Sequence, residues 1–133
     1  ETSIRGLHLL LAEDNELNAE IAARLLNDEG ATVQVVRDGQ QAIDAFASRP
    51  QGTYDAILMD IMMPKIDGYT ATRVIRSTNR QDAKVIPIIA MTAHVFVEDV
   101  KQCLEAGMNA HLPKPLQMEK VVSTIARLCK RKK

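Results

Sequence analysis

The chain has 133 residues, of which 46% are hydrophobic and 26% are charged, as is ordinary for one globular domain with a real core. Its 17 basic and 17 acidic side chains cancel, which argues against a nucleic-acid or membrane surface as partner. The sequence shows no signal peptide, no apolar stretch of membrane-spanning length and no C-x-x-C spacing of its two cysteines, so we expect a cytoplasmic protein with reduced thiols. Because the first residue is Glu1 rather than Met, we expect a processed protein or, in preference, a domain cut from a longer protein.

Apolar runs alternate with segments of helical periodicity five times along the chain. The runs are nearly continuous, as expected of strands that are buried on both faces. We predict strands at residues 7–12, 32–37, 56–59, 85–91 and 108–112. We predict helices near residues 17–26, 38–46, 69–77, 95–106 and 118–128.

Some details of this pattern are less regular. The third and fourth helices are expected to bury Val74, Phe96 and Leu104, among other apolar residues. Residues 77–83 are polar and are predicted to form a loop. Pro87 lacks a backbone donor, which suits an edge strand or the first residues of a strand.

The alternation of strands and helices implies a parallel sheet with helices on both faces. No repeat, low-complexity tract or linker divides the chain. The prediction is a single doubly wound α/β domain over residues 1–133, with a core from about 7 to 129 and flexible ends at 1–6 and 130–133. The last four residues are all basic, which suits the solvated end of a helix.

Polar side chains follow four of the predicted strands. Glu13 and Asp14 come after the first strand, Asp60 after the third, Thr92 after the fourth and Lys114 after the fifth. Open parallel sheets present their ligand sites at the carboxyl ends of the strands, so these side chains are expected to share one edge. Each alone has an ordinary explanation, such as a helix cap or a surface charge. Their common position favours a functional site.

The charges of this set point to a metal ion and a phosphoryl group. Neighbouring carboxylates repel one another, and an ammonium group or a divalent cation relieves that repulsion. Mg²⁺ prefers carboxylate and water oxygens as ligands. The three carboxylates and Lys114 sum to two negative charges, which one Mg²⁺ neutralises, and Lys114 and Thr92 can then donate to phosphoryl oxygens. The sequence therefore predicts phosphoryl transfer to a carboxylate.

Four motifs occur in order along the chain: L-L-A-E-D-N at residues 10–15, D-I-M-M-P-K-I-D-G at 60–68, M-T-A at 91–93 and L-P-K-P at 112–115. Each motif is weak alone, but the ordered set is specific. On these motifs the chain resembles the receiver domain of two-component response regulators over essentially its whole length. The resemblance implies a (βα)5 flavodoxin-like domain with a five-stranded parallel sheet of strand order 2-1-3-4-5.

The resemblance also implies roles for individual residues. Asp60 would be the phosphoacceptor. Mg²⁺ would be bound by Glu13, Asp14, Asp60 and the backbone carbonyl of Met62. Thr92 would be the switch hydroxyl, and Lys114 would contact the phosphoryl group, with a cis Lys114–Pro115 peptide bond.

One position departs from the family pattern. The family usually has Tyr or Phe three residues before the lysine, as a switch residue that rotates, and here that residue is His111. An imidazole can pack in the same place, and a packed neutral histidine is the expected state.

The segments L-L-A-E-D-N-E-L-N and A-H-L-P-K-P look most like those of receivers within hybrid sensor histidine kinases. The implied function is that of a phosphoacceptor domain, not an enzyme, which takes a phosphoryl group from a partner phosphohistidine and switches conformation. The implied partners are a histidine kinase dimerisation domain or a histidine phosphotransfer domain. No nucleic-acid partner and no direct membrane contact are expected.

The lifetime of the phosphorylated state depends on a water in line with the Asp60–phosphorus bond. The residues expected to control that water are Met62 and His94, two positions beyond Asp60 and Thr92. The thioether of Met62 can shield the phosphoryl group, so slow self-dephosphorylation is predicted.

Several other functions have less support in the sequence. A phosphatase of the haloacid dehalogenase type needs D-x-D after the first strand, where this chain has E-D-N. A flavin site lacks both a phosphate loop and the aromatic residues to stack on the ring, and neither G-x-G-x-x-G nor a P-loop is present. The three histidines lack zinc-ligand spacing. A receiver that is never phosphorylated and serves as a scaffold stays open as an alternative.

Overall fold

The computed structural model describes residues 3–93 and 97–129. The strands are β1 (His8–Ala12), β2 (Thr32–Val36), β3 (Ala56–Asp60), β4 (Ile88–Thr92) and β5 (Ala110–Pro113). The helices are α1 (Glu16–Asp28), α2 (Gly39–Ala47), α3 (Gly68–Arg76), α4 (Gln81–Val85), α5 (Val97–Ala106) and α6 (Met118–Cys129). Within the described residues, no helix is long and apolar enough to cross a bilayer.

The strands form one parallel sheet in the order β2-β1-β3-β4-β5, which confirms the predicted fold. β3 lies in the centre, between β1 and β4. Every residue of β3 and of β4 is buried, as the continuous apolar runs predict. The sheet therefore brings the ends of β1, β3, β4 and β5 to one edge.

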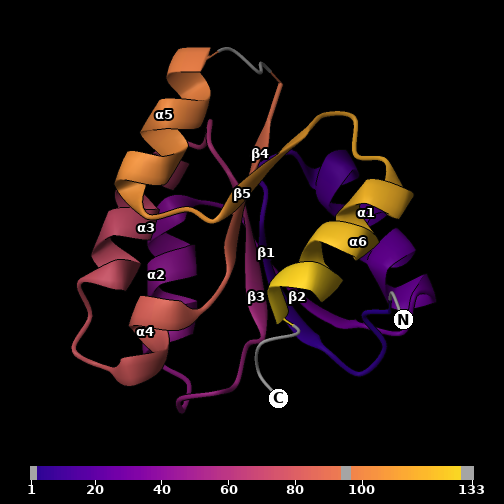
Figure 1. Cartoon of the computed structure of the whole chain (residues 1–133), viewed down its shortest axis with the longest axis horizontal. Coiled ribbons are helices and arrows are strands. Elements are labelled where there is room, and N and C mark those ends of the chain that lie inside the picture. Colours follow the sequence, from indigo (N-terminus) through magenta and orange to yellow (C-terminus); the bar gives the residue numbers. More distant parts are fainter. Residues whose placement is uncertain (1–2, 94–96, 130–133) are drawn as a thin grey trace.

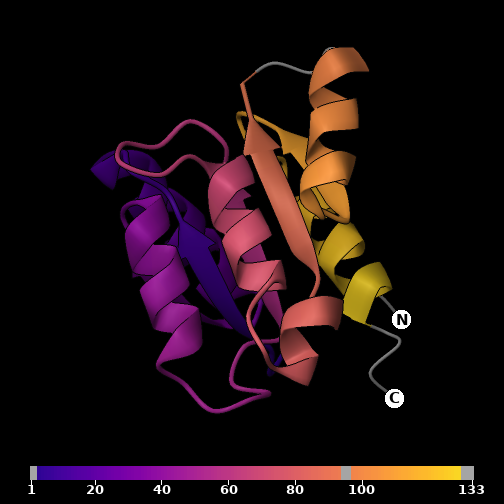
Figure 2. The same cartoon turned by 90° about the vertical axis from the view of Figure 1, so that its left-hand side faces the viewer.

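Helices cover both faces of the sheet and give the domain three layers (Figure 1). α1 and α6 lie on one face, and α2, α3 and α5 lie on the other; Figure 2 gives a second view of the latter face. Neighbouring strand residues enter different cores because side chains alternate across a strand. Leu10 and Ala12 belong to the core under α2 and α3, whereas Leu9 and Leu11 belong to the core under α1 and α6.

Each of the first three strands is followed by a residue that caps the next helix. Asn15, Asp38 and Asp67 each accept a hydrogen bond from the backbone N–H three residues further along the chain. Such caps stabilise a helix by about 1 kcal/mol each. Asn15 and Asp38 keep the loops after β1 and β2 short, whereas residues 61–67 form a longer loop between β3 and α3.

The prediction of a loop at 77–83 and a strand at 85–91 is wrong in its boundaries. Residues 81–85 form α4, and β4 begins only at Ile88. Val85 is exposed at the end of α4, and Pro87 precedes the strand. The Arg80 guanidinium pairs with Asp82 within this short helix and also donates to the distant carbonyl of Phe46. Local sequence periodicity does not report such contacts.

Two residues expected in the core are exposed, Val74 on α3 and Leu104 on α5. α3 instead buries Ala71, Ile75 and Thr72. Thr72 tolerates burial because its hydroxyl donates to the Gly68 carbonyl at 2.8 Å.

The core also begins earlier than expected, since Ile4 is fully buried against it. Residues 130–133, expected to be a flexible end, and Phe96, expected in the core, lie outside the described residues.

Candidate functional site

The ends of β1 and β3 bring three carboxylates together. Oxygens of Glu13, Asp14 and Asp60 all lie within 4.8 Å of one another. Glu13 and Asp60 are buried, whereas Asp14 is exposed. The cluster therefore opens to solvent on one side, as a site for an incoming ligand requires.

Lys114 closes the cluster from the end of β5. Its Nζ lies 2.9 Å from Glu13 Oε1 and 3.1 Å from Asp60 Oδ2. Its backbone N–H donates to the Thr92 carbonyl at 2.8 Å, so the ends of β4 and β5 are joined at the site. The Lys114–Pro115 peptide bond is cis, as predicted from the family resemblance.

The loop after β3 orients Asp60. The Met62 N–H donates to Asp60 Oδ1 at 3.3 Å, so each carboxylate oxygen of Asp60 has a donor. The Gly68 N–H donates to the Ile61 carbonyl at 2.9 Å. A Cβ on Gly68 would lie only 2.4 Å from the Asp60 carbonyl oxygen, so this loop can fold back over the strand end only with glycine there.

Burial and charge act differently on the three groups that form ion pairs. Burial raises the pKa of Asp60 to about 6, although the hydrogen bond from Lys114 opposes the shift. Burial has the same tendency at Glu13, but hydrogen bonds from Lys114 and the Asn15 N–H outweigh it and lower the Glu13 pKa. Burial would lower the pKa of Lys114, but the two carboxylates raise it. As the pH falls, Asp60 is thus protonated before Glu13.

The donor set fits a hard divalent cation. Carboxylate oxygens from two strand ends converge within reach of a single ion, and oxygen ligands of this kind suit Mg²⁺. Without a cation, only the Lys114 ammonium pairs with the two buried carboxylates of the cluster in the described part of the chain. Glu13, Asp14 and Asp60 are the side chains that could hold the metal.

The remaining predicted residues differ in position. Thr92 is buried at the end of β4, beside the cluster. His111 is half-buried on β5 and pairs with Ala90 of β4, two residue pairs before the strand end. Met62 is 76% exposed, so its side chain extends into solvent rather than over Asp60. His94 lies outside the described residues.

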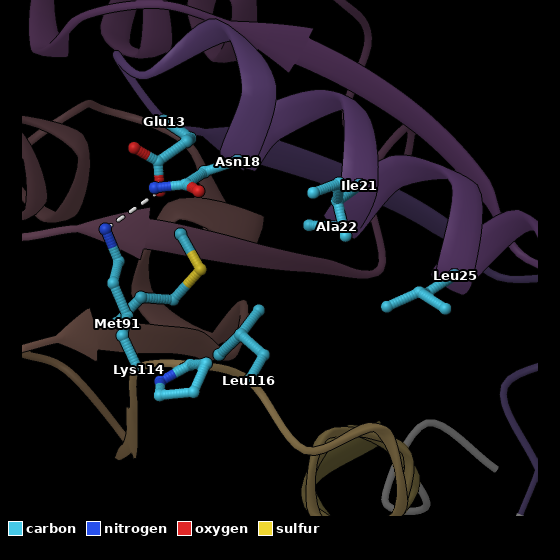
Figure 3. Close-up of a pocket in the computed structure, with 9 residues that line it drawn as sticks. Glu13, Asn18, Ile21, Ala22, Leu25, Met91, Lys114 and Leu116 are labelled. Atoms are coloured by element: carbon cyan, nitrogen blue, oxygen red, sulfur yellow. Dashed lines mark ion pairs between the residues drawn. The ribbon is translucent and has the colours of Figure 1, made fainter.

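A groove that the sequence analysis missed extends from the cluster along α1 (Figure 3). Glu13 and Lys114 lie at one end of it and Leu25 at the other, and Ile21 and Leu116 lie between them. Its volume is about 380 Å³. Leu17, Ile21 and Leu25, each four residues apart on α1, are 64%, 50% and 37% exposed. This spacing was a usable signal, because α1 fills its core face with Ala19, Ala22 and Leu26 instead.

Comparison with known proteins gives a consistent result. The model of the response regulator receiver domain family matches residues 9–126. Histidine kinase 1 from Arabidopsis thaliana is 38% identical over 98% of this chain, and the osmosensing histidine protein kinase SLN1 from Saccharomyces cerevisiae is 38% identical over 97% of it. The chain spans only 13% and 10% of the length of these two relatives.

Solved structures agree. The receiver domain of sensor histidine kinase PA1611 from Pseudomonas aeruginosa, solved with a magnesium ion coordinated in its active site cleft, has a TM-score of 0.83 and 40% identity, over 94% of this chain and 98% of that one. The receiver domain of the Francisella response regulator 1452 has a TM-score of 0.85 and 26% identity, over 96% of this chain and 100% of that one.

Proposed function

This chain belongs to the response regulator receiver domain family, and from that premise we propose that Asp60 accepts a phosphoryl group from a phosphohistidine on a partner protein. The observation that carries the proposal is the placement of a buried carboxylate at the end of the central strand. There it faces Glu13 and Asp14 and lies 3.1 Å from the Lys114 ammonium.

In the proposed step, an Asp60 oxygen attacks phosphorus, a P–O bond forms and the P–N bond to the histidine breaks. The electron pair of that bond stays on the ring nitrogen, and a histidine whose other nitrogen carries a proton leaves as neutral imidazole. The Asp60 pKa of about 6 supports this role, because the carboxylate is mostly ionised at pH 7. Lys114 and the Met62 N–H hold its two oxygens.

Glu13, Asp14, Asp60 and the Met62 carbonyl are the proposed Mg²⁺ ligands. When bound, the ion supplies positive charge that offsets the charge of the phosphoryl oxygens. The shared reach of the three carboxylates supports this assignment, as does the magnesium ion in the related Pseudomonas receiver.

Thr92 is the proposed switch residue. It is buried at the end of β4, next to β3, and its carbonyl accepts the Lys114 N–H. A phosphoryl group on Asp60 offers acceptors for the Thr92 hydroxyl and the Lys114 ammonium, and such charge-assisted bonds favour one of two conformations. His111 on the adjacent strand β5 is the residue proposed to follow that change.

The groove along α1 is the proposed docking surface for the partner. Because Glu13 and Lys114 line both the groove and the cluster, a protein seated in the groove has its reactive histidine beside Asp60. The i, i+4, i+8 spacing of the exposed residues on α1 suits a helix that packs alongside it. We therefore assign the groove to a helical face of the phosphohistidine-bearing protein, in a histidine kinase or a histidine phosphotransfer domain.

The relatives extend the proposal to the protein around this domain. Receiver regions in histidine kinases are among the most similar known sequences, so we assign the chain to a hybrid sensor histidine kinase. Its place of action would be the cytoplasm, where Mg²⁺ and phosphodonors are available.

Mass measurement after incubation with Mg²⁺ and acetyl phosphate tests the proposal. The expected result is one added phosphoryl group, labile to hydroxylamine, that is absent in Asp60→Asn and after addition of EDTA. Asp67→Asn is the matched control, because asparagine caps a helix as well as aspartate does and Asp67 is outside the cluster. Labelling of Asp60→Asn equal to that of the parent would overturn the assignment. A parent that binds its partner but accepts no phosphoryl group would be a scaffold.

A further inference from the structure

Arg37, in the turn between β2 and α2, holds the loop that carries two of the proposed metal ligands. The hydrogen-bond ladder between β1 and β2 continues past the strands with the Glu13 N–H, which donates to the Val36 carbonyl at 3.0 Å. One residue further on, the Asp14 carbonyl accepts from a side chain, Arg37 Nη2, at 3.0 Å. A guanidinium thus binds the backbone of the loop in place of a neighbouring strand.

The Arg37 side chain is held from its own backbone outwards. Its N–H donates to Gln41 Oε1 at 2.8 Å, and the next residue, Asp38, caps α2. Both contacts keep the turn against the first turn of α2. The guanidinium therefore reaches the Asp14 carbonyl from a backbone that is itself fixed by hydrogen bonds.

The arginine makes this contact although one of its donors has no acceptor. Arg37 Nε is buried, and within the described residues it has no hydrogen-bond partner. A buried donor left unpaired disfavours the folded state, so its presence calls for an explanation. No carboxylate of the described chain forms an ion pair with Arg37, so a surface salt bridge does not supply one.

We propose that Arg37 is a positioning residue for the metal site, which fixes the Asp14 backbone so that the Glu13 and Asp14 carboxylates face Asp60. The inference rests on the proposed function, because it takes these carboxylates as Mg²⁺ ligands. Groups that orient metal ligands from outside typically change metal affinity by about 10–100-fold when they are lost.

The sign of the effect separates positioning from simple electrostatics. A guanidinium close to an acidic cluster repels a cation, so removing its charge would by itself tighten Mg²⁺ binding. Loss of positioning would weaken it. Arg37→Met removes the donor and the charge but keeps a long apolar side chain, and Arg37→Lys keeps the charge but removes the forked guanidinium.

The experiment is a Mg²⁺ titration of the intact domain without phosphodonor. The amide chemical shifts of Asp14, Asp60 and Met62 report the binding of the ion. We expect the dissociation constant to rise about 10-fold in Arg37→Met and several-fold in Arg37→Lys. At saturating Mg²⁺, labelling by acetyl phosphate should recover to within about twofold of the parent, because the nucleophile and Lys114 are unchanged.

Arg80→Met is the matched control. Arg80 also clamps backbone carbonyls, those of Phe46 and Arg49, with its guanidinium, but it does so next to α4, away from the cluster. The Arg80→Met substitution should lower the melting temperature and leave the Mg²⁺ affinity unchanged.

Three outcomes decide the inference. Unchanged or tighter Mg²⁺ binding in Arg37→Met would overturn it, and if that variant does not fold, the same result in Arg37→Lys would do so. Weaker binding in Arg80→Met as well would reduce the effect to general destabilisation and would also overturn it. A parent that binds no Mg²⁺ would instead contradict the proposed function.

Discussion

Asp60 and Glu13 share one buried cluster and one lysine, yet their charges are controlled differently. Glu13 gains hydrogen bonds from Lys114 and from the Asn15 N–H, which together stabilise its ionised form and lower its pKa. At Asp60, burial destabilises the ionised form more than the hydrogen bond from Lys114 stabilises it, so the Asp60 pKa rises to about 6. The ionised form of Asp60 is therefore less stable than the ionised form of Glu13. Perturbed pKa values of this kind are typical of reactive groups.

This difference predicts how Asp60 affects stability. Because its folded pKa of about 6 exceeds the unfolded value of about 3.9, Asp60 binds more protons in the folded state between these values. Its contribution to stability is complete below about pH 4 and is lost as the pH rises through about 6. Asparagine does not titrate. At pH 7 without Mg²⁺, we expect Asp60→Asn to be more stable than the parent by roughly 1–2 kcal/mol, after allowance for solvent screening.

Thermal unfolding of the parent and of Asp60→Asn between pH 4 and pH 8 in EDTA measures this difference in stability. The gap in melting temperature should narrow as the pH falls toward 4. Asp67→Asn, in an exposed cap, should follow the parent throughout. Parallel curves for the parent and Asp60→Asn would show that burial does not destabilise the Asp60 carboxylate.

Met62 gives a prediction about the lifetime of the phosphorylated state. Its side chain is exposed beside Asp60, and a thioether neither donates to nor orients the attacking water. Asparagine at this position can do both. Since a well-oriented group that handles the water is worth about 10²-fold or more, we expect several-fold faster loss of phosphate from Met62→Asn at fixed pH and Mg²⁺.

Met62→Leu is the control for this comparison, because leucine is also apolar and should decay at the parent's rate. The decay of phosphorylated protein, followed by mass, gives both rates. An unchanged rate in Met62→Asn would mean that the side chain at this position does not orient the attacking water.

At the scale of elements, strands were more predictable than helix boundaries. β1, β3 and β4 are continuous apolar runs because both of their faces are buried. The termini of the strands are marked by charged or capping residues, so the acidic edge was predictable as well. Helix faces were less so, since exposed Leu17 and Leu104 have the same apolar character as buried residues. α4 was missed because it is short and because its polar contacts, from Arg80 to Asp82 and to the distant Phe46 carbonyl, leave no apolar periodicity to detect.

The connections that position the site were beyond sequence reasoning for a related reason. Gly39, at the start of α2, lies against the loop after β3, and a Cβ there would lie 2.1 Å from the Ile66 carbonyl oxygen. Arg37 reaches the loop after β1. Both contacts join segments that follow different strands, so no spacing within one segment reveals them. The strand-end residues were predictable because topology alone places them together.

At the scale of the whole molecule, the acidic cluster and the α1 groove form one continuous surface. Glu13 of the cluster lines the groove next to Asn18 of α1, and the residues after β5 close the groove through Lys114 and Leu116 (Figure 3). α5 lies on the opposite face of the sheet (Figure 1). A partner that fills the groove therefore leaves the α5 face accessible, so receiving the phosphoryl group and passing on the conformational change can use different surfaces.

This separation predicts that phosphodonors of different size respond differently to a change in the groove. Ile21→Glu places a charge in the apolar groove without touching the cluster, so labelling by acetyl phosphate should stay within about twofold of the parent. Transfer from a phosphorylated histidine phosphotransfer domain should slow by about 10-fold or more, because a central apolar contact of an interface is typically worth 1–2 kcal/mol or more. Leu104→Glu, on α5 at a position that is 63% exposed against 50% for Ile21, should leave both reactions unchanged. The two rates measured side by side decide the matter: equal slowing with both donors would mean that Ile21 supports the site itself, and no slowing with the protein donor would place the docking surface elsewhere.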